Sequence, residues 1–244
     1  MIPTRGRIFY GWFVVAGSVL VVFGVYGSQF SFGVFLKPMT EEFGWTRGTL
    51  SLVFGVTFML VGLLRPVAGY LTDRYSPRMV ALTGVVIVGA ILLLIPLVKS
   101  LAPLFVLFAA MSVGITMGAG PTLTKIVSAW FYERRGLTLG LVNSGGSLGA
   151  MILVPATSAF LVLLDWRQAY LFLGVVLLVV ILPAGFFLIR NRPQDMGLKP
   201  LGEPGGAARA GSPSRVREWS GRDLTLREAT CTPIFWRLTF GYFV

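Results

Sequence analysis

Six long runs of apolar residues, separated by short charged segments, constrain this chain more than any other feature. Each run has 20 or more residues, which is the length an α-helix needs to cross about 30 Å of hydrocarbon at 1.5 Å per residue. The runs are Ile8–Leu36, Gly48–Thr72, Met79–Val98, Leu101–Thr124, Gly136–Leu164 and Gln168–Ile189. The pattern predicts an all-α membrane protein, a bundle of six transmembrane helices.

The composition supports a lipid bilayer as the surroundings of this chain. Charged residues make up 13% of the 244 residues, whereas a soluble domain carries about 25%. The chain has no histidine and one cysteine, Cys231, so histidine triads, thiolate metal cages and internal disulfides are excluded. We expect no catalytic residue, metal or cofactor. The net charge of +11 lies mainly between the runs and after residue 189, which indicates topology rather than a nucleic-acid partner.

The sequence stops inside a seventh apolar run. Residues Pro233–Val244 are too few to span the hydrocarbon. The segment before them is rich in Gly, Pro, Ser and Arg, which is typical of a flexible linker. We predict a six-helix bundle over residues 1–190, a cytoplasmic linker over 191–232 and a truncated seventh helix over 233–244. A carboxy-terminal six-helix half is then missing from this chain.

Basic residues in the short loops predict the orientation. A cleavable signal peptide is the alternative for the amino terminus, but the first run is about twice as long as such a segment usually is. With the amino terminus in the cytoplasm, the inner segments hold seven Lys or Arg residues and the outer ones four, as the positive-inside rule requires. The inner residues are Arg5, Arg7, Arg74, Arg78, Lys125, Arg134 and Arg135, and the outer ones are Lys37, Arg47, Lys99 and Arg167. We therefore expect a multi-pass protein of the plasma membrane.

The second and fifth runs resemble each other, which suggests an internal duplication. Each begins with Arg-Gly, at Arg47 and Arg135, and each carries a proline near its far end, Pro66 and Pro155. Duplicated three-helix units are common in transporter folds. We interpret the six runs as a 3+3 repeat.

The turn between the second and third runs carries the clearest local motif, Gly69-Tyr-Leu-Thr-Asp73-Arg74-Tyr-Ser-Pro77-Arg78. It resembles the signature loop of the major facilitator superfamily, G-x-L-x-D-R-x-G-R-R, with Ser76 in place of a glycine. The resemblance implies the major facilitator fold and a gating function for this turn, because charged contacts at helix ends can hold one conformation and release in another. A turn that only sets topology is the alternative.

Further segments resemble the monocarboxylate and oxalate/formate branch of that superfamily. They are Tyr10-Gly11-Trp12, Ser31-Phe-Gly-Val-Phe-Leu-Lys-Pro38, Trp130-Phe-Tyr-Glu-Arg-Arg-Gly-Leu-Thr-Leu-Gly140 and Asp165-Trp-Arg167. The resemblance implies alternating-access transport of small organic anions such as monocarboxylates. A proton or a counter-anion is then the coupled ion, and the lipid bilayer and the small-molecule substrate are the partners.

Two basic residues are candidates for the transport path. Arg65 is the one charge well inside a run, and a central arginine is costly unless it faces a cavity or a partner. In the alternative interpretation, the side chain of Arg65 extends towards the nearby membrane surface. Lys125 lies at the inner end of the fourth run, where this alternative is stronger.

Uncharged polar residues extend the list of cavity candidates. Tyr26, Ser28 and Gln29 lie in the first run and Asn143 lies in the fifth. A shared wet cavity or hydrogen bonds between helices explain them equally well.

Glycine pairs and tryptophans have structural interpretations. Gly114-xxx-Gly118, Gly136-xxx-Gly140 and Gly145-xxx-Gly149 predict faces for close helix packing. Trp12, Trp45, Trp130 and Trp166 fall near run ends and predict anchors at the membrane interface.

Transport is the favoured function, and a six-span membrane scaffold or assembly subunit is the alternative. An enzyme is disfavoured, because the chain has no histidine, no cysteine pair and no paired carboxylates within the runs.

Overall fold

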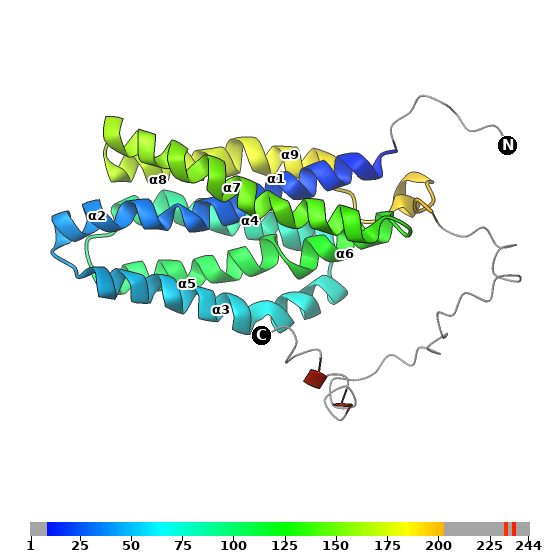
Figure 1. Ribbon diagram of the computed structural model, residues 1–244, viewed down its shortest axis with the longest axis horizontal. Coiled ribbons are helices and arrows are strands. Elements are labelled where there is room, and N and C mark those ends of the chain that lie inside the picture. Colours follow the sequence, from blue (N-terminus) through cyan, green and yellow to red (C-terminus); the bar gives the residue numbers. More distant parts are fainter. Residues whose placement is uncertain (1–8, 203–231, 234–235, 238–244) are drawn as a thin grey trace, which may run out of the picture. The chain divides into compact units, whose positions relative to one another are not determined.

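The computed structural model describes residues 9–202, 232–233 and 236–237, and within these residues the chain is built from helices. It divides into two units, Met1–Glu203 and Pro204–Val244. The predicted linker beyond residue 202 and most of the predicted seventh helix lie outside the described residues. The first unit is a bundle whose helices run lengthwise beside one another (Figure 1).

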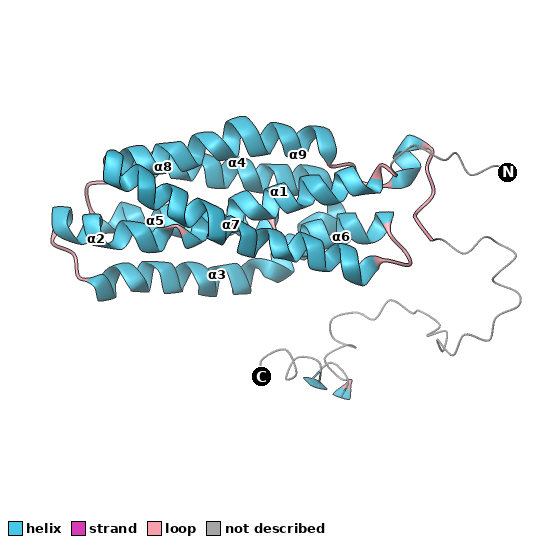
Figure 2. Cartoon of the chain, turned by 45° about the horizontal axis from the view of Figure 1, so that its top comes forward, coloured by secondary structure: helices cyan, strands magenta, loops and turns pink. Residues whose placement is uncertain are grey.

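Six helical segments of the first unit are long and apolar enough to cross a membrane, which confirms the predicted number. In chain order they consist of α1 (Gly11–Phe30) with α2 (Phe32–Phe43); α3 (Arg47–Arg74); α4 (Pro77–Leu94) with a 3-10 turn at Ile95–Leu97; α5 (Leu101–Gly118) with α6 (Pro121–Trp130); α7 (Arg135–Leu163); and α8 (Trp166–Val175), a π-helical turn at Val176–Ile181 and α9 (Leu182–Leu188). Short loops join them at the two ends of the bundle (Figure 2).

Local sequence signals explain where these helices begin and end. Gly44 ends α2 with a φ of 68°, a left-handed conformation that glycine adopts easily. The side chain of Thr46 accepts a hydrogen bond from the amide of Thr49 and so caps α3. Gly120, with a φ of 70°, separates α5 from α6, and Pro121 then occupies the first turn of α6. Because Gly44 ends α2, the first helical segment extends to Phe43, beyond Leu36, where the uncharged run ends.

The helix packing confirms the 3+3 repeat. The first span packs along the fifth through α1 and α7, and the fourth packs along the second through α5 and α3. In a 3+3 repeat, the first span corresponds to the fourth and the second to the fifth, so the pair of spans one and five corresponds to the pair of spans four and two. The second and fifth spans are also the two least buried ones, with 22% of the most apolar stretch of each buried, against 56% in the first and third.

Two of the three predicted glycine faces are packing contacts. Gly145 and Gly149 of α7 lie against the backbone of α1, at Val19 and Phe23, and Gly114 and Gly118 of α5 lie against Gly84 of α4. Gly136 and Gly140 make no such contact within the described part of the chain, because no described atom lies within 4 Å of a Cβ built at either position.

The interfacial role predicted for Trp130 and Trp166 is wrong. Both side chains are buried in the bundle, with 0% and 2% exposed. Trp130 donates a hydrogen bond to the carbonyl oxygen of Arg190, and Trp166 donates one to the carboxylate of Glu42. Their indole N–H groups thus join distant parts of the chain instead of reaching the lipid headgroups.

Candidate functional site

Gln29, in the last turn of α1, is the most unusual polar side chain in the described bundle. Only 3% of the residue is exposed, yet neither its amide nitrogen nor its amide oxygen has a hydrogen-bond partner among the described residues. Leaving a buried polar group without a partner costs about 1–3 kcal/mol. A ligand or a water molecule that bonds to this amide would recover that free energy.

Helical spacing places Gln29 on the side of the first span that faces α5. Val25, four residues earlier, contacts Gly118 of α5, and the ring of Phe32, three residues later, lies 5.0 Å from the ring of Phe108 of the same helix. Residues spaced in this way share one face of a helix. The unpaired amide therefore belongs to the seam between the first and fourth spans.

The other polar candidates of α1 have different surroundings. The hydroxyl of Ser28 is buried and donates to the carbonyl oxygen of Gly24 in its own helix, at 2.7 Å. The ring of Tyr26 is half-buried and lies against Gly146 of α7. Asn143 is exposed and lies one helical turn before Gly146. Tyr26 therefore packs against α7 one helical turn from Asn143, and no described contact joins the two side chains to Gln29.

Arg65 lies on the exposed side of α3, directly before Pro66. In the described part of the chain, no carboxylate or hydrogen-bond acceptor binds its guanidinium group. On the buried side of α3 one turn earlier, the carbonyl oxygen of Val61 faces Thr116 of α5. The described contacts do not join Arg65 to Gln29, so the structure leaves these two candidates on separate helices.

Lys125 belongs with the predicted gating turn. Its ammonium group lies 2.5 Å from a carboxylate oxygen of Asp73 and 3.4 Å from the carbonyl oxygen of Thr72. The hydroxyls of Thr72 and Thr122 are 3.1 Å apart and add a second contact between α3 and α6. Both charged side chains are largely exposed, so the pair contributes little stability by itself. It fixes the turn against α6.

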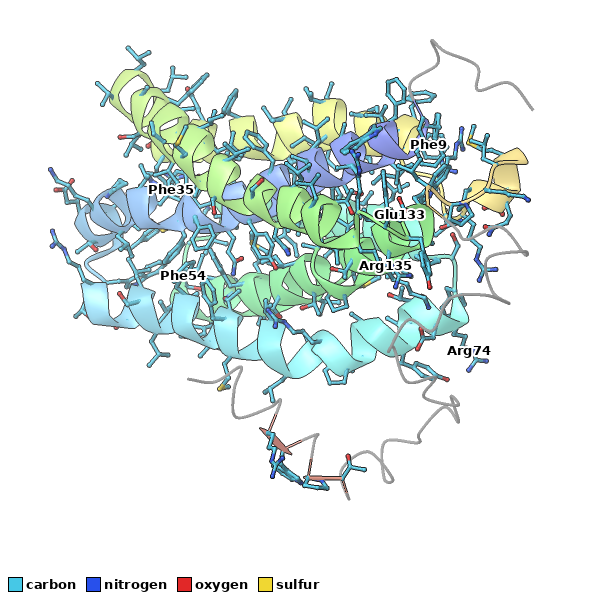
Figure 3. All side chains as sticks on the ribbon, turned by 45° about the vertical axis from the view of Figure 1, so that its right-hand side comes forward. Phe9, Phe35, Phe54, Arg74, Glu133 and Arg135 are labelled. Atoms are coloured by element: carbon cyan, nitrogen blue, oxygen red, sulfur yellow. The ribbon has the colours of Figure 1, made fainter. Side chains whose placement is uncertain are left out.

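The rest of the turn is held by short-range contacts. Arg74 donates to the hydroxyl of Tyr70, and Pro77 occupies the first turn of α4. Figure 3 shows Arg74 at the same end of the bundle as Glu133 and Arg135. No described atom lies within 4 Å of a Cβ built at Gly69, so any close helix approach that requires this glycine involves a partner outside the described residues.

The segment after the sixth span is bonded to this end of the bundle. The side chain of Asn191 accepts hydrogen bonds from the hydroxyl of Ser76 and from the backbone amide of Arg78. Further along, Leu201 exchanges two backbone hydrogen bonds with the loop after α6, to Trp130 and Tyr132. The first residues of the predicted linker are thus attached to the turn and to its neighbouring loop.

At the opposite end, a charged cluster that the sequence did not reveal joins α2 to α8. The carboxylate of Glu42 accepts hydrogen bonds from the indole of Trp166 and from both terminal nitrogens of Arg167. The rings of Phe35 and Tyr170 stack beneath it at 3.8 Å between centroids. This cluster fastens the first span to the sixth.

The sequence profile of the Major Facilitator Superfamily matches residues 18–244. The oxalate:formate antiporter of Oxalobacter formigenes is 22% identical over 232 residues, which is 95% of this chain and 51% of that protein. Monocarboxylate transporter 1 of Bos taurus is 29% identical over 175 residues, 69% of this chain and 34% of that protein. The chain therefore spans about half of the first of these relatives and about a third of the second.

A solved structure shares the fold. A bacterial homologue of the human lysosomal transporter Spinster, in an inward-facing and unoccupied conformation, aligns with a TM-score of 0.68 at 18% identity. The alignment covers 97% of this chain and 52% of that one. At this level of identity the likeness concerns the arrangement of helices.

Proposed function

Since this chain belongs to the Major Facilitator Superfamily, we propose that the full-length protein moves small organic anions across a membrane by alternating access. In such proteins two six-helix halves rock about a site near the middle of the bilayer. This chain supplies one half, and a second six-helix half completes the transporter. The relatives named for oxalate, formate and monocarboxylates support small carboxylates as the substrate class.

The main observation that supports this proposal is the unpaired charge of Arg65. A guanidinium group well inside a span, with no carboxylate bonded to it in the described part of the chain, is suited to bind an anion. Arginine and a carboxylate can form two parallel charge-assisted hydrogen bonds, which gives both affinity and orientation. Arg65 is the proposed contact to the substrate carboxylate.

The remaining candidates have supporting functions in this proposal. The unpaired amide of Gln29 and the polar groups of Tyr26, Ser28 and Asn143 line the path. The turn of Gly69, Asp73, Arg74, Pro77 and Arg78, held by Lys125, gates its cytoplasmic end. The exposed faces of α3 and α7 receive the second half. A proton or a counter-anion is the coupled ion.

The proposed location is the plasma membrane, with the amino terminus in the cytoplasm. The excess of Lys and Arg on the loops at that end supports this orientation. Reading the coding sequence beyond Val244 is a direct check of the organisation: six further spans are expected, and a stop codon would contradict a second half within the same polypeptide.

Arg65→Gln in the full-length protein tests the substrate contact. Losing a hydrogen bond to a charged group costs about 1.5–3 kcal/mol, so the KM for carboxylate uptake is expected to rise roughly 10- to 100-fold. Arg47→Gln is the matched control, because Arg47 is an exposed arginine at the far end of the same helix. An unchanged KM in Arg65→Gln, with normal amounts of folded protein, would remove Arg65 from the substrate site.

A further inference from the structure

An apolar groove lies between α4 and α9, away from the proposed transport path. Its volume is about 450 Å³, and its walls are formed by apolar side chains and Thr83. Met79, Val86 and Phe186 in these walls are 57%, 42% and 48% exposed, so the groove is open along its length. From Met79 to Val86 the wall extends about 10 Å along α4. In a membrane-spanning bundle such an opening meets the lipid chains.

A cation lies at one end of this groove. Arg78 directly precedes Met79, and the centre of its guanidinium group lies 4.5 Å from the centre of the Phe186 ring. One terminal nitrogen donates to the carbonyl oxygen of Phe186. The Nε atom is buried and has no partner among the described residues. Because a guanidinium group has five N–H donors, most donors of Arg78 remain available to bind an acceptor.

A second cation lies beside the first. The side chain of Asn191 accepts a hydrogen bond from the backbone amide of Arg78, at 2.9 Å, which brings the preceding residue, Arg190, next to Arg78. The positive charge of Arg190 acts on Arg78. Neither arginine forms an ion pair with a carboxylate in the described part of the chain, so their mutual repulsion is uncompensated.

We propose that this groove binds an anionic phospholipid, with its phosphate held by Arg78 and Arg190 and one acyl chain lying between α4 and α9. The arginines require a negative charge and the groove requires a long apolar group, and this lipid supplies both in one molecule. Basic pockets between transmembrane helices bind anionic headgroups in this way. Arg78 also belongs to the proposed gating turn, but the lipid proposal can fail independently of the transport proposal, because lipid binding is measured without transport.

Native mass spectrometry of the full-length protein tests the proposal. The protein is purified in detergent and incubated with phosphatidylglycerol or with phosphatidylcholine, which has similar acyl chains but no net charge. Bound phosphatidylglycerol is expected to exceed phosphatidylcholine at least about fivefold. Arg78→Gln and Arg190→Gln should each lower its binding about fivefold, and Arg192→Gln, at an exposed neighbouring arginine, should leave it unchanged.

A second variant distinguishes the contribution of the apolar groove to lipid binding from that of the two arginines. Val86→Trp fills the groove while both arginines stay in place, and it should also remove the bound phosphatidylglycerol. Equal binding of the two lipids, unchanged binding in Val86→Trp, or displacement of the lipid by glycerol phosphate alone would each overturn the proposal. Cross-linking of the Val86→Cys variant to another part of the polypeptide would also overturn it, because a protein segment would then occupy the groove. If Arg78→Gln does not fold, Arg190→Gln and Val86→Trp still decide the question.

Discussion

The Gly149→Ala variant is expected to lose about 3 kcal/mol of stability, which corresponds to a fall of roughly 6–12 °C in Tm for a unit of this size. A Cβ at this position would overlap the carbonyl oxygen of Phe23 and lie 3.1 Å from the amide nitrogen of Gly27. Both are backbone atoms of α1, so no change of side-chain rotamer can relieve the overlap. The whole of α7 would have to move away from α1.

Gly140→Ala is the matched control for this prediction. It makes the same change in the same helix, at a position where no described atom lies within 4 Å of the new Cβ. Alanine also has a higher helix propensity than glycine, so the control should be as stable as the parent or slightly more stable. Thermal unfolding of the purified proteins, followed by tryptophan fluorescence, measures both. Equal Tm values for the two variants would contradict the close packing of α1 and α7.

The Glu42→Ala variant is expected to lose roughly 2–3 kcal/mol, because it removes the acceptor of three hydrogen bonds, two of them from a charged arginine. The indole N–H of the buried Trp166 then has no acceptor, and Arg167 keeps its contact with Asp165 at 3.4 Å and its position over the Trp166 ring. The carboxylate is partly exposed, so solvent screening keeps the loss below that of a fully buried ion pair.

Glu41→Ala is the control for the outer cluster. Glu41 is the adjacent residue, and its pairing with Lys37 is loose, at 3.9 Å between two exposed side chains. Such a pair contributes about 0–1 kcal/mol. Glu42→Gln, which keeps an acceptor for Trp166 but loses the charge, should fall between the two. The same unfolding measurement applies, and a Tm of Glu42→Ala equal to that of Glu41→Ala would show that the cluster does not fasten the first span to the sixth.

The number of spans and two of the glycine packing faces could be predicted because they depend on local properties of the chain. A run of about 20 apolar residues has one low-energy conformation in hydrocarbon, a helix with all its backbone hydrogen bonds made internally. Small residues four positions apart favour close approach, and the faces at Gly114–Gly118 and Gly145–Gly149 follow this rule. The helix ends extend beyond the runs because Lys37 and Glu41 end the apolar pattern without ending the helix.

The contacts between distant residues could not be predicted, because each depends on which helices become neighbours. Trp130 and Trp166 have the sequence context of interfacial anchors, and only the packing shows that they are buried. Glu42 meets residues 124 and 125 positions later in the chain. The pairing of Lys125 with Asp73 likewise requires α3 and α6 to lie side by side. The sequence identified Gln29 as polar, and only the structure shows that its amide has no partner there.

In the proposed function, this six-helix unit forms half of a transporter for small organic anions. Counterflow into proteoliposomes that contain the full-length protein tests it most directly. The liposomes are loaded with unlabelled oxalate, formate or lactate, and the entry of the radiolabelled anion is followed. We expect saturable uptake that the internal anion accelerates and that Arg65→Gln weakens but Arg47→Gln does not. Uptake no faster than in protein-free liposomes for every carboxylate, with protein that is monodisperse and folded, would contradict it.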